Sequence, residues 1–181
     1  MEVLECINTR RSIRNFKSEL IDHDTINAII KAAIMSPSFK NTQTTRYNII
    51  ENGELIDEIA ETCALNYEFN QKTLRRSPQL VVVSIVEEHG AYGWDGASFF
   101  TKEDRWEVFD AGIASQTFCL AAHAMGIGAS FIGIFDADKV AQLINLPKNQ
   151  KVVTLITIGY PNEECEATPR KTLEEVVRWY I

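Results

Sequence analysis

The sequence predicts a mixed α+β fold in which helices pack in layers against a sheet. Two apolar runs rich in β-branched residues, 79–86 and 152–160, are typical of buried strands. Apolar residues at helical spacing predict more helices than strands, and pairs of helices fall between the strands. This order favours an α+β layer fold over a regular alternating Rossmann domain.

The first half of the chain predicts mainly helices. Asp22 or Asp24 can cap the second helix, and Ser36-Pro37 ends it. The predicted elements, in order, are helices over 3–8 and 25–34, a loop over 38–45, a strand over 46–51, a turn at Gly53 and a helix over 54–67.

The second half opens with the strand at 79–86 and a long segment, 87–104, with three glycines and four aromatic residues. We expect that segment to be a binding lid or an excursion from the domain. Residues 105–125 predict the longest helix, which should be buried because it is apolar on nearly every side from 111 to 124. The remaining predictions are a helix stop at Gly126 and Gly128, an extended segment over 129–135, a short helix over 137–144 capped by Asp136, an irregular tail over 161–172 and a short closing element over 173–180.

Composition excludes several classes of protein. A length of 181 residues suits one domain, 1–181, and a net charge of −7 with a pI near 5.0 argues against a nucleic-acid-binding surface. No apolar run approaches the roughly 18 residues of a membrane span. The N-terminus lacks the pattern of a signal peptide, so we expect a cytoplasmic protein. The four cysteines and three histidines show no ligand spacing, so we expect no bound metal.

A local reversal of charge marks one candidate site. Arg10, Arg11, Arg14 and Lys17 fall within eight positions of an acidic chain, and no carboxylate occurs among residues 6–18. Such a cluster can hold an anion, and arginine suits a phosphate because its planar fork donates two hydrogen bonds at once. A solvated basic turn is the alternative interpretation.

The glycines at 126, 128 and 133 do not form a dinucleotide-binding loop. Their spacing is wrong, and they follow a predicted helix rather than a strand. We expect them to end a helix and to let the backbone approach a bulky group.

Four segments in order closely resemble the FMN-dependent nitroreductase family. They are residues 9–16 (TRRSIRNF), 32–43 (AAIMSPSFKNTQ), 121–133 (AAHAMGIGASFIG) and 158–161 (IGYP) followed by Pro169-Arg170-Lys171. The resemblance extends from about residue 4 to 175. It implies a three-layer fold with a central, mostly antiparallel sheet flanked by helices. It also implies an intertwined homodimer with FMN at its interface.

The resemblance also implies which residues bind the cofactor. Arg10 and Arg170 would bind the phosphate, with help from Arg11 and Ser12, and Arg14 would approach the ribityl chain and the N1/O2 edge of the flavin. The other candidates are Pro37, Ser38 and Phe39 from the partner chain, Asn41 and Gln43 facing polar atoms of the cofactor, the backbone of Ile132, Gly133 and Ile134 beside the flavin, and Lys171 next to Arg170.

The expected activity is ping-pong hydride transfer from NAD(P)H through FMN to a nitroaromatic, a quinone or a similar acceptor. This chemistry belongs to the cofactor, and the sequence shows no catalytic triad or carboxylate pair; a cation near N1/O2 would stabilise the reduced flavin. Alternatives are an enzyme of the same fold with a dedicated substrate, for dehalogenation or dehydrogenation, and a non-catalytic flavin-binding protein.

Three features depart from the family pattern. Thr44 and Thr45 stand where many members have Pro and Trp, and Gly133 replaces the acidic residue of one subgroup. The chain also carries no ferredoxin module, so we expect electrons to come from a separate donor.

Overall fold

A computed structural model describes residues 1–87 and 106–181. At its centre lies a four-stranded sheet in the order β1-β2-β4-β3, formed by Thr45–Ile50, Gln79–Val86, Gln150–Gly159 and Gly128–Ile132. Every neighbouring pair is antiparallel. The α+β class and the antiparallel sheet are therefore confirmed, and the 87–104 segment lies, apart from Glu87, outside the described residues.

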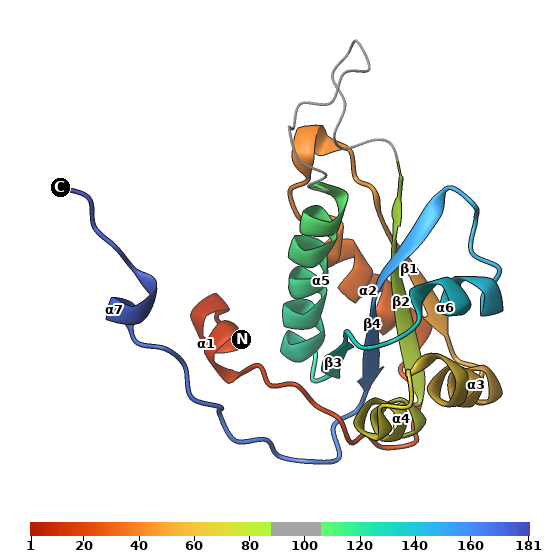
Figure 1. The fold of residues 1–181 in the computed structure, drawn as a ribbon. Helices are drawn as coiled ribbons and strands as arrows, with labels where there is room; N and C mark the ends of the chain where they lie inside the picture. The colour runs from red at the N-terminus through yellow and green to blue at the C-terminus, as the bar shows by residue number, and fades with distance from the viewer. Residues whose placement is uncertain (88–105) are drawn as a thin grey trace, which may run out of the picture.

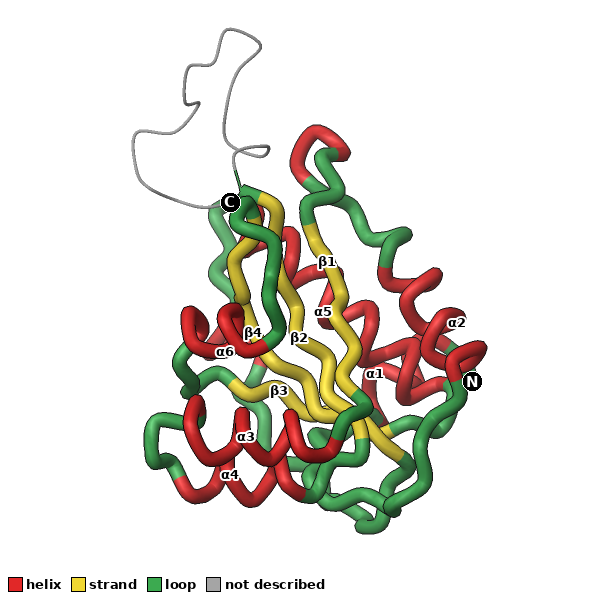
Figure 2. Tube along the Cα trace, turned by 90° about the vertical axis from the view of Figure 1, so that its right-hand side faces the viewer, coloured by secondary structure: helices red, strands yellow, loops and turns green. Residues whose placement is uncertain are grey.

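Helices cover both faces of the sheet (Figures 1 and 2). One face carries α2 (His23–Ala33) and α5 (Trp106–Ala124), and the other carries α3 (Gly53–Cys63), α4 (Glu68–Arg75) and α6 (Ala137–Leu143). Successive side chains of β2 alternate between the two layers. Val81 and Val83 belong to the core under α2 and α5, whereas Leu80 and Val82 belong to the core under α3 and α6.

Two short helices lie outside these layers, α1 (Val3–Thr9) and α7 (Leu173–Val176). Helix α1 touches the C-terminal half of α5, and α7 sits in a tail that leaves the body of the molecule (Figure 1). The predicted closing element over 173–180 is helical only in its first four residues, and Val177 is already extended.

One predicted helix is too long, and another was not predicted. The helix expected over 54–67 ends at Cys63, because Leu65 and Asn66 adopt left-handed φ values of 49° and 58°. Helix α4 then follows with a polar sequence, and its buried positions include Asn70 and Thr73. Hydrophobic periodicity cannot reveal a helix whose inward face is partly polar.

Candidate functional site

The arginine segment, residues 10–14, runs along the edge of the sheet directly after α1. Ser12 forms a parallel bridge with Ala129 of β3, and the amide of Ile13 donates to the Ala129 carbonyl at 3.1 Å. Gly128 makes this approach possible, because a Cβ there would lie 2.8 Å from the Cβ of Ile13. The segment is therefore fixed to the sheet although it belongs to no regular element.

The arginines differ in their surroundings. The Arg11 guanidinium donates from Nη1 to the Asn8 carbonyl at 2.7 Å and to the Arg10 carbonyl at 2.9 Å. Its Nε is buried and has no acceptor among the described residues. The Arg14 guanidinium lies 5.5 Å above the ring of Phe69 on α4. The structure therefore turns Arg14 toward α4, away from the hydrogen bonds that Arg11 makes.

The tail runs beside the arginine segment as far as Cys165. Asn162 donates its amide to the Asn15 carbonyl at 3.0 Å. A carboxylate oxygen of Glu163 accepts from the amides of Arg14 at 2.7 Å and Asn15 at 3.1 Å. The thiol of Cys165 reaches the Ser12 carbonyl at 3.8 Å. These contacts are 147 to 153 residues apart in sequence, so no local pattern could have indicated them.

The structure does not place Arg170 and Lys171 against that segment. Both are exposed, in the part of the tail that leaves the body (Figure 1). The Arg170 guanidinium donates to the carbonyls of Thr168 at 2.9 Å and Pro169 at 3.3 Å, and also to the Thr168 hydroxyl. The predicted phosphate clamp between Arg10 and Arg170 is therefore not assembled within this one chain.

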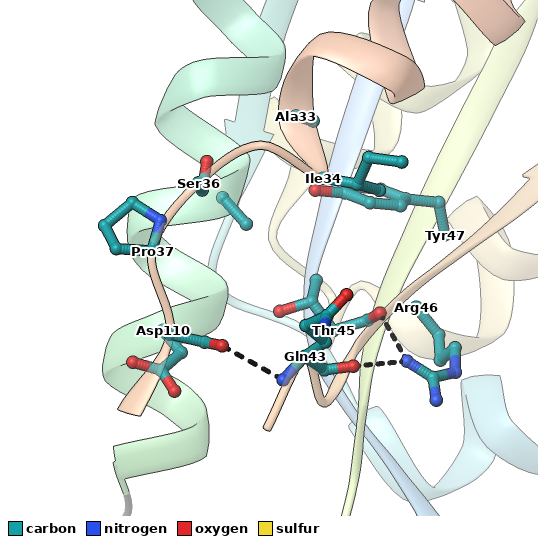
Figure 3. Close-up of a pocket in the computed structure, with 11 residues that line it drawn as sticks. Ala33, Ile34, Ser36, Pro37, Gln43, Thr45, Arg46, Tyr47 and Asp110 are labelled. Carbon is teal, nitrogen blue, oxygen red and sulfur yellow. Dashed lines mark hydrogen bonds between the residues drawn. The ribbon is translucent and has the colours of Figure 1, made fainter. Parts of the chain in front are cut away.

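A second group of candidates lines a cavity of about 150 Å³ between α2, α5 and β1 (Figure 3). Pro37, Ser38 and Gln43 contribute to its wall, together with Tyr47 and Asp110, which the sequence did not indicate. The Tyr47 hydroxyl is buried without a partner among the described residues. Burial raises the pKa of that hydroxyl to about 12.

The loop that carries these candidates has an unusual backbone. Lys40, Asn41 and Gln43 have φ values of 50°, 57° and 50°, a conformation that costs free energy for residues with a side chain. The Ser38 hydroxyl accepts from the Gln43 amide at 3.0 Å, and the Asn41 amide donates to the Ser38 carbonyl at 2.9 Å. The loop is therefore held in one shape by its own polar groups.

Helix α5 anchors this loop to the body. Asp110 is buried, and its Oδ2 accepts from the Phe39 amide at 2.9 Å. Burial raises the pKa of this carboxyl, the Phe39 amide opposes that shift, and the charge of Glu107 adds to it. The Phe39 ring stacks on Trp106 at 5.2 Å, and the Ser36 hydroxyl donates to Thr117 at 2.8 Å. At the C-terminal end of the loop, the Arg46 guanidinium donates a hydrogen bond to the Gln43 carbonyl at 2.7 Å.

The third group of candidates follows β3. Ile132 is buried in the core, whereas Gly133 and Ile134 are exposed. A Cβ on Gly133 would meet no described atom within 4 Å, and the Ile134 carbonyl accepts from Asn70 of α4 at 3.0 Å. Of these three candidates, Gly133 is the one shown to have open space beside its backbone among the described residues.

The arginine segment and the loop lie at opposite ends of α5 (Figure 1). Asp110 holds the loop near the start of α5, and His123 contacts Thr9, beside the arginines, near its end. Thirteen residues separate the two contacts, which corresponds to about 20 Å of helix. The two groups of candidates therefore do not form one pocket within a chain.

Cys119 is buried, and burial raises the pKa of its thiol to about 12, so it carries no thiolate at neutral pH. Within residues 1–87 and 106–181, no three acidic, histidine or cysteine side chains gather as a metal site. No helix in the same residues has both the length and the hydropathy that crossing a membrane requires.

The residues present fit a phosphate-bearing flavin. The arginine segment offers cationic donors, including a buried Arg11 Nε that still lacks an acceptor among the described residues. The backbone at Gly133 leaves room for a flat group. Arginines can hold a phosphate, and open backbone amides can approach a ring.

Comparisons with known proteins agree on one family. Residues 7–160 match the model of the nitroreductase family. The chain is 28% identical over 177 residues to an NADPH-flavin oxidoreductase of Vibrio harveyi, an alignment that covers 96% of this chain and 72% of that protein. It is 27% identical over 171 residues to a 5,6-dimethylbenzimidazole synthase of Rhodospirillum rubrum. That alignment covers 86% of this chain and 80% of that protein.

A solved structure shows the same architecture. It is the NADPH:FMN oxidoreductase of Vibrio harveyi in complex with NAD+, which superposes with a TM-score of 0.81 at 26% identity. The match covers 98% of this chain and 76% of that one. With a family model matched over most of its length, the chain belongs to the nitroreductase family.

Proposed function

We propose that residues 1–181 form a single FMN-binding domain that assembles into a homodimer. The dimer would transfer hydride from NAD(P)H to a nitroaromatic, a quinone or a similar acceptor in a ping-pong reaction. Membership of the nitroreductase family makes the chain an oxidoreductase of nitroreductase type. The observation that carries the cofactor proposal is the arginine segment, a cationic cluster pinned to the sheet edge of an otherwise acidic protein.

Each group of residues has a distinct task in this proposal. Arg10, Arg11 and Ser12 bind the phosphate, and Arg14 places positive charge where the reduced flavin is negative. The rigid loop at 37–43 limits the access of water and positions the polar side chains of Asn41 and Gln43. FMN, when bound, supplies the hydride chemistry itself. The protein needs no side-chain nucleophile, in accord with the neutral Cys119.

The distance between the half-sites supports the homodimer. One chain presents the arginines about 20 Å from the loop along α5, so a second chain is needed to bring a loop beside them. The tail also exposes Leu173 (74%), Val176 (62%), Trp179 (84%) and Tyr180 (86%). Large apolar side chains gathered on one exposed segment are typical of an interface. Arg170 and Lys171, in the same tail, would then bind a phosphate held mainly by the other chain.

The direct test of the cofactor is a visible spectrum of the purified protein, taken before and after anaerobic addition of NADH or NADPH. We expect a flavin spectrum that bleaches with at least one of the two donors. We also expect parallel lines in double-reciprocal plots with a quinone acceptor. A protein that is colourless and binds no FMN on reconstitution would contradict the proposal.

The shared site can be tested with two variants in one dimer. A chain with Arg10→Ala and a chain with Gln43→Gly, each with its own affinity tag, would be co-expressed and the mixed dimer purified. Glycine at 43 keeps the left-handed backbone while removing the side chain. If each site combines Arg10 of one chain with Gln43 of the other, the mixed dimer has one intact site and binds one FMN. Binding no stronger than that of the parent dimers would show that the sites are not shared.

A second candidate function is an enzyme of the same fold with a dedicated substrate. The similarity to the Rhodospirillum rubrum protein, whose name denotes a synthase, favours it. A substrate screen separates the two functions: broad turnover of nitro compounds and quinones supports the first, and reaction with one substrate class supports the second. Reduction without turnover of any acceptor would indicate a non-catalytic flavin-binding protein.

A further inference from the structure

A histidine of α5 holds the end of α1, one residue before the arginine segment. His123 Nε2 lies 2.8 Å from the hydroxyl oxygen of Thr9. The Thr9 hydroxyl donates its only proton to the Glu5 carbonyl at 2.8 Å. The bond between the two side chains therefore runs from the imidazole N–H to Thr9.

Helix α1 depends on contacts of this kind for its position. Its seven residues are too few for a helix that is stable alone. Val3, Leu4 and Ile7 are exposed, so apolar packing holds little of it in place. The thiol of Cys6 adds one polar contact to α5, to the Leu120 carbonyl at 3.3 Å.

Arg10 and Arg11, which are proposed to bind the phosphate, lie between two anchors. The Arg10 amide donates to the Cys6 carbonyl at 3.0 Å, so Arg10 still belongs to the end of α1. On the other side, Ser12 and Ile13 are fixed to Ala129 of β3. If the contact of α1 with α5 is lost, the anchor on the N-terminal side of Arg10 loosens while the other one remains.

The surroundings of His123 favour the neutral form of its imidazole near neutral pH. Burial lowers the pKa of its imidazole, and the cations Arg10 and Arg11 lower it further. The neutral ring carries its proton on Nε2 when it donates to Thr9, and the protonated ring also donates from Nε2. The contact is therefore present in both protonation states.

We propose that His123 is a positioning residue for the cofactor phosphate, which through Thr9 fixes the end of α1 and thereby aims Arg10 and Arg11. This inference rests on the proposed function, in which those arginines bind the phosphate of FMN. It assigns a role to an α5 side chain that does not touch the cofactor.

Titrations of the full-length protein with FMN and with riboflavin test this proposal, because riboflavin has the same ring system without the phosphate. The variants are His123→Leu, His123→Gln and Thr9→Val, whose urea unfolding is measured in parallel. We expect His123→Leu and Thr9→Val to bind FMN about fivefold more weakly, as expected for loss of one hydrogen bond, with unchanged riboflavin affinity. His123→Gln should keep most of the FMN affinity, because its amide N–H can still donate to Thr9.

The outcomes separate this inference from the function on which it rests. A wild-type protein that binds no FMN overturns the proposed function and this inference together. If the wild type binds FMN, two results overturn the inference alone. One is unchanged FMN affinity in both His123→Leu and Thr9→Val, and the other is an equal loss of FMN and riboflavin affinity, which indicates a merely structural role.

Discussion

Replacement of Gly128 by alanine tests whether the arginine segment is held by close packing on β3. The new Cβ would lie 2.8 Å from Ile13 Cβ, 2.9 Å from its Cγ2 and 3.0 Å from its Cγ1. Carbon atoms pack best at about 3.5–4.0 Å, so at least one backbone must move by about 0.7 Å. Since Cβ of Ile13 is itself in the clash, a change of side-chain rotamer cannot relieve it.

The expected cost follows from two opposing effects. Overpacking of this size destabilises a protein by about 1–3 kcal/mol. Replacement of a glycine also reduces the entropy of the unfolded chain, which returns about 0.4–1 kcal/mol. We therefore expect Gly128→Ala to lower the free energy of unfolding by about 1.5 kcal/mol, and the Tm by roughly 3–6 °C for a chain of this size.

Gly133→Ala is the matched control, because it lies five residues further along the chain and its Cβ would meet no described atom within 4 Å. Equilibrium urea unfolding, followed by far-UV circular dichroism, measures both variants. We expect Gly133→Ala to gain about 0.4–1 kcal/mol from the same entropy effect, because no clash opposes it. It should nevertheless bind FMN more weakly, since its methyl group enters the space proposed for the flavin. Equal stability of Gly128→Ala and wild type would refute the packing argument.

Three further predictions concern pH, helix termination and the division of labour between arginines. Burial raises the pKa of Cys119 from 9.0 to about 12, so the unfolded chain loses the thiol proton at lower pH than the folded chain. Between these two values the free energy of unfolding falls by up to about 1.4 kcal/mol per pH unit. In urea unfolding at pH 8 to 11, Cys119→Ala should therefore lose less stability with rising pH than the wild type. Gly126 ends α5 with a φ of 77°, so Gly126→Ala should reduce stability by about 1–2 kcal/mol whereas Gly126→Asn should reduce it less, measured by the same unfolding assay. Arg10→Ala should mainly weaken FMN binding, whereas Arg14→Ala should mainly lower the flavin reduction potential in a dye-equilibration assay; the same response from both would contradict the assigned roles.

The sequence predicts the fold where burial follows a simple period. The run at 79–86 is apolar at all positions except Gln79 and Ser84 because alternate residues enter two different cores, and the structure buries all eight. Helix α4 escaped prediction because Asn70 is one of its buried residues and bonds to the Ile134 carbonyl. A polar side chain that is buried by a distant partner leaves no periodic signal.

The candidate site also has one part that the sequence indicates and one part that it does not. The arginine cluster is local in sequence and breaks the charge pattern of the chain, so it could be found without a structure. Its supports could not be found, because Glu163 reaches the Arg14 amide across 149 positions and His123 reaches Thr9 across 114. Only the tertiary fold brings these partners together.

Helix α5 explains why the two groups of candidate residues lie apart within one chain. Its N-terminal end holds the strained loop through Asp110, and its C-terminal end holds α1 through His123. A straight helix fixes the distance between these anchors at about 20 Å, and no side-chain motion can shorten it. If one cofactor uses both groups, they must come from two chains related by symmetry. The same rigidity that separates the half-sites within a chain would then align each with its counterpart in the dimer.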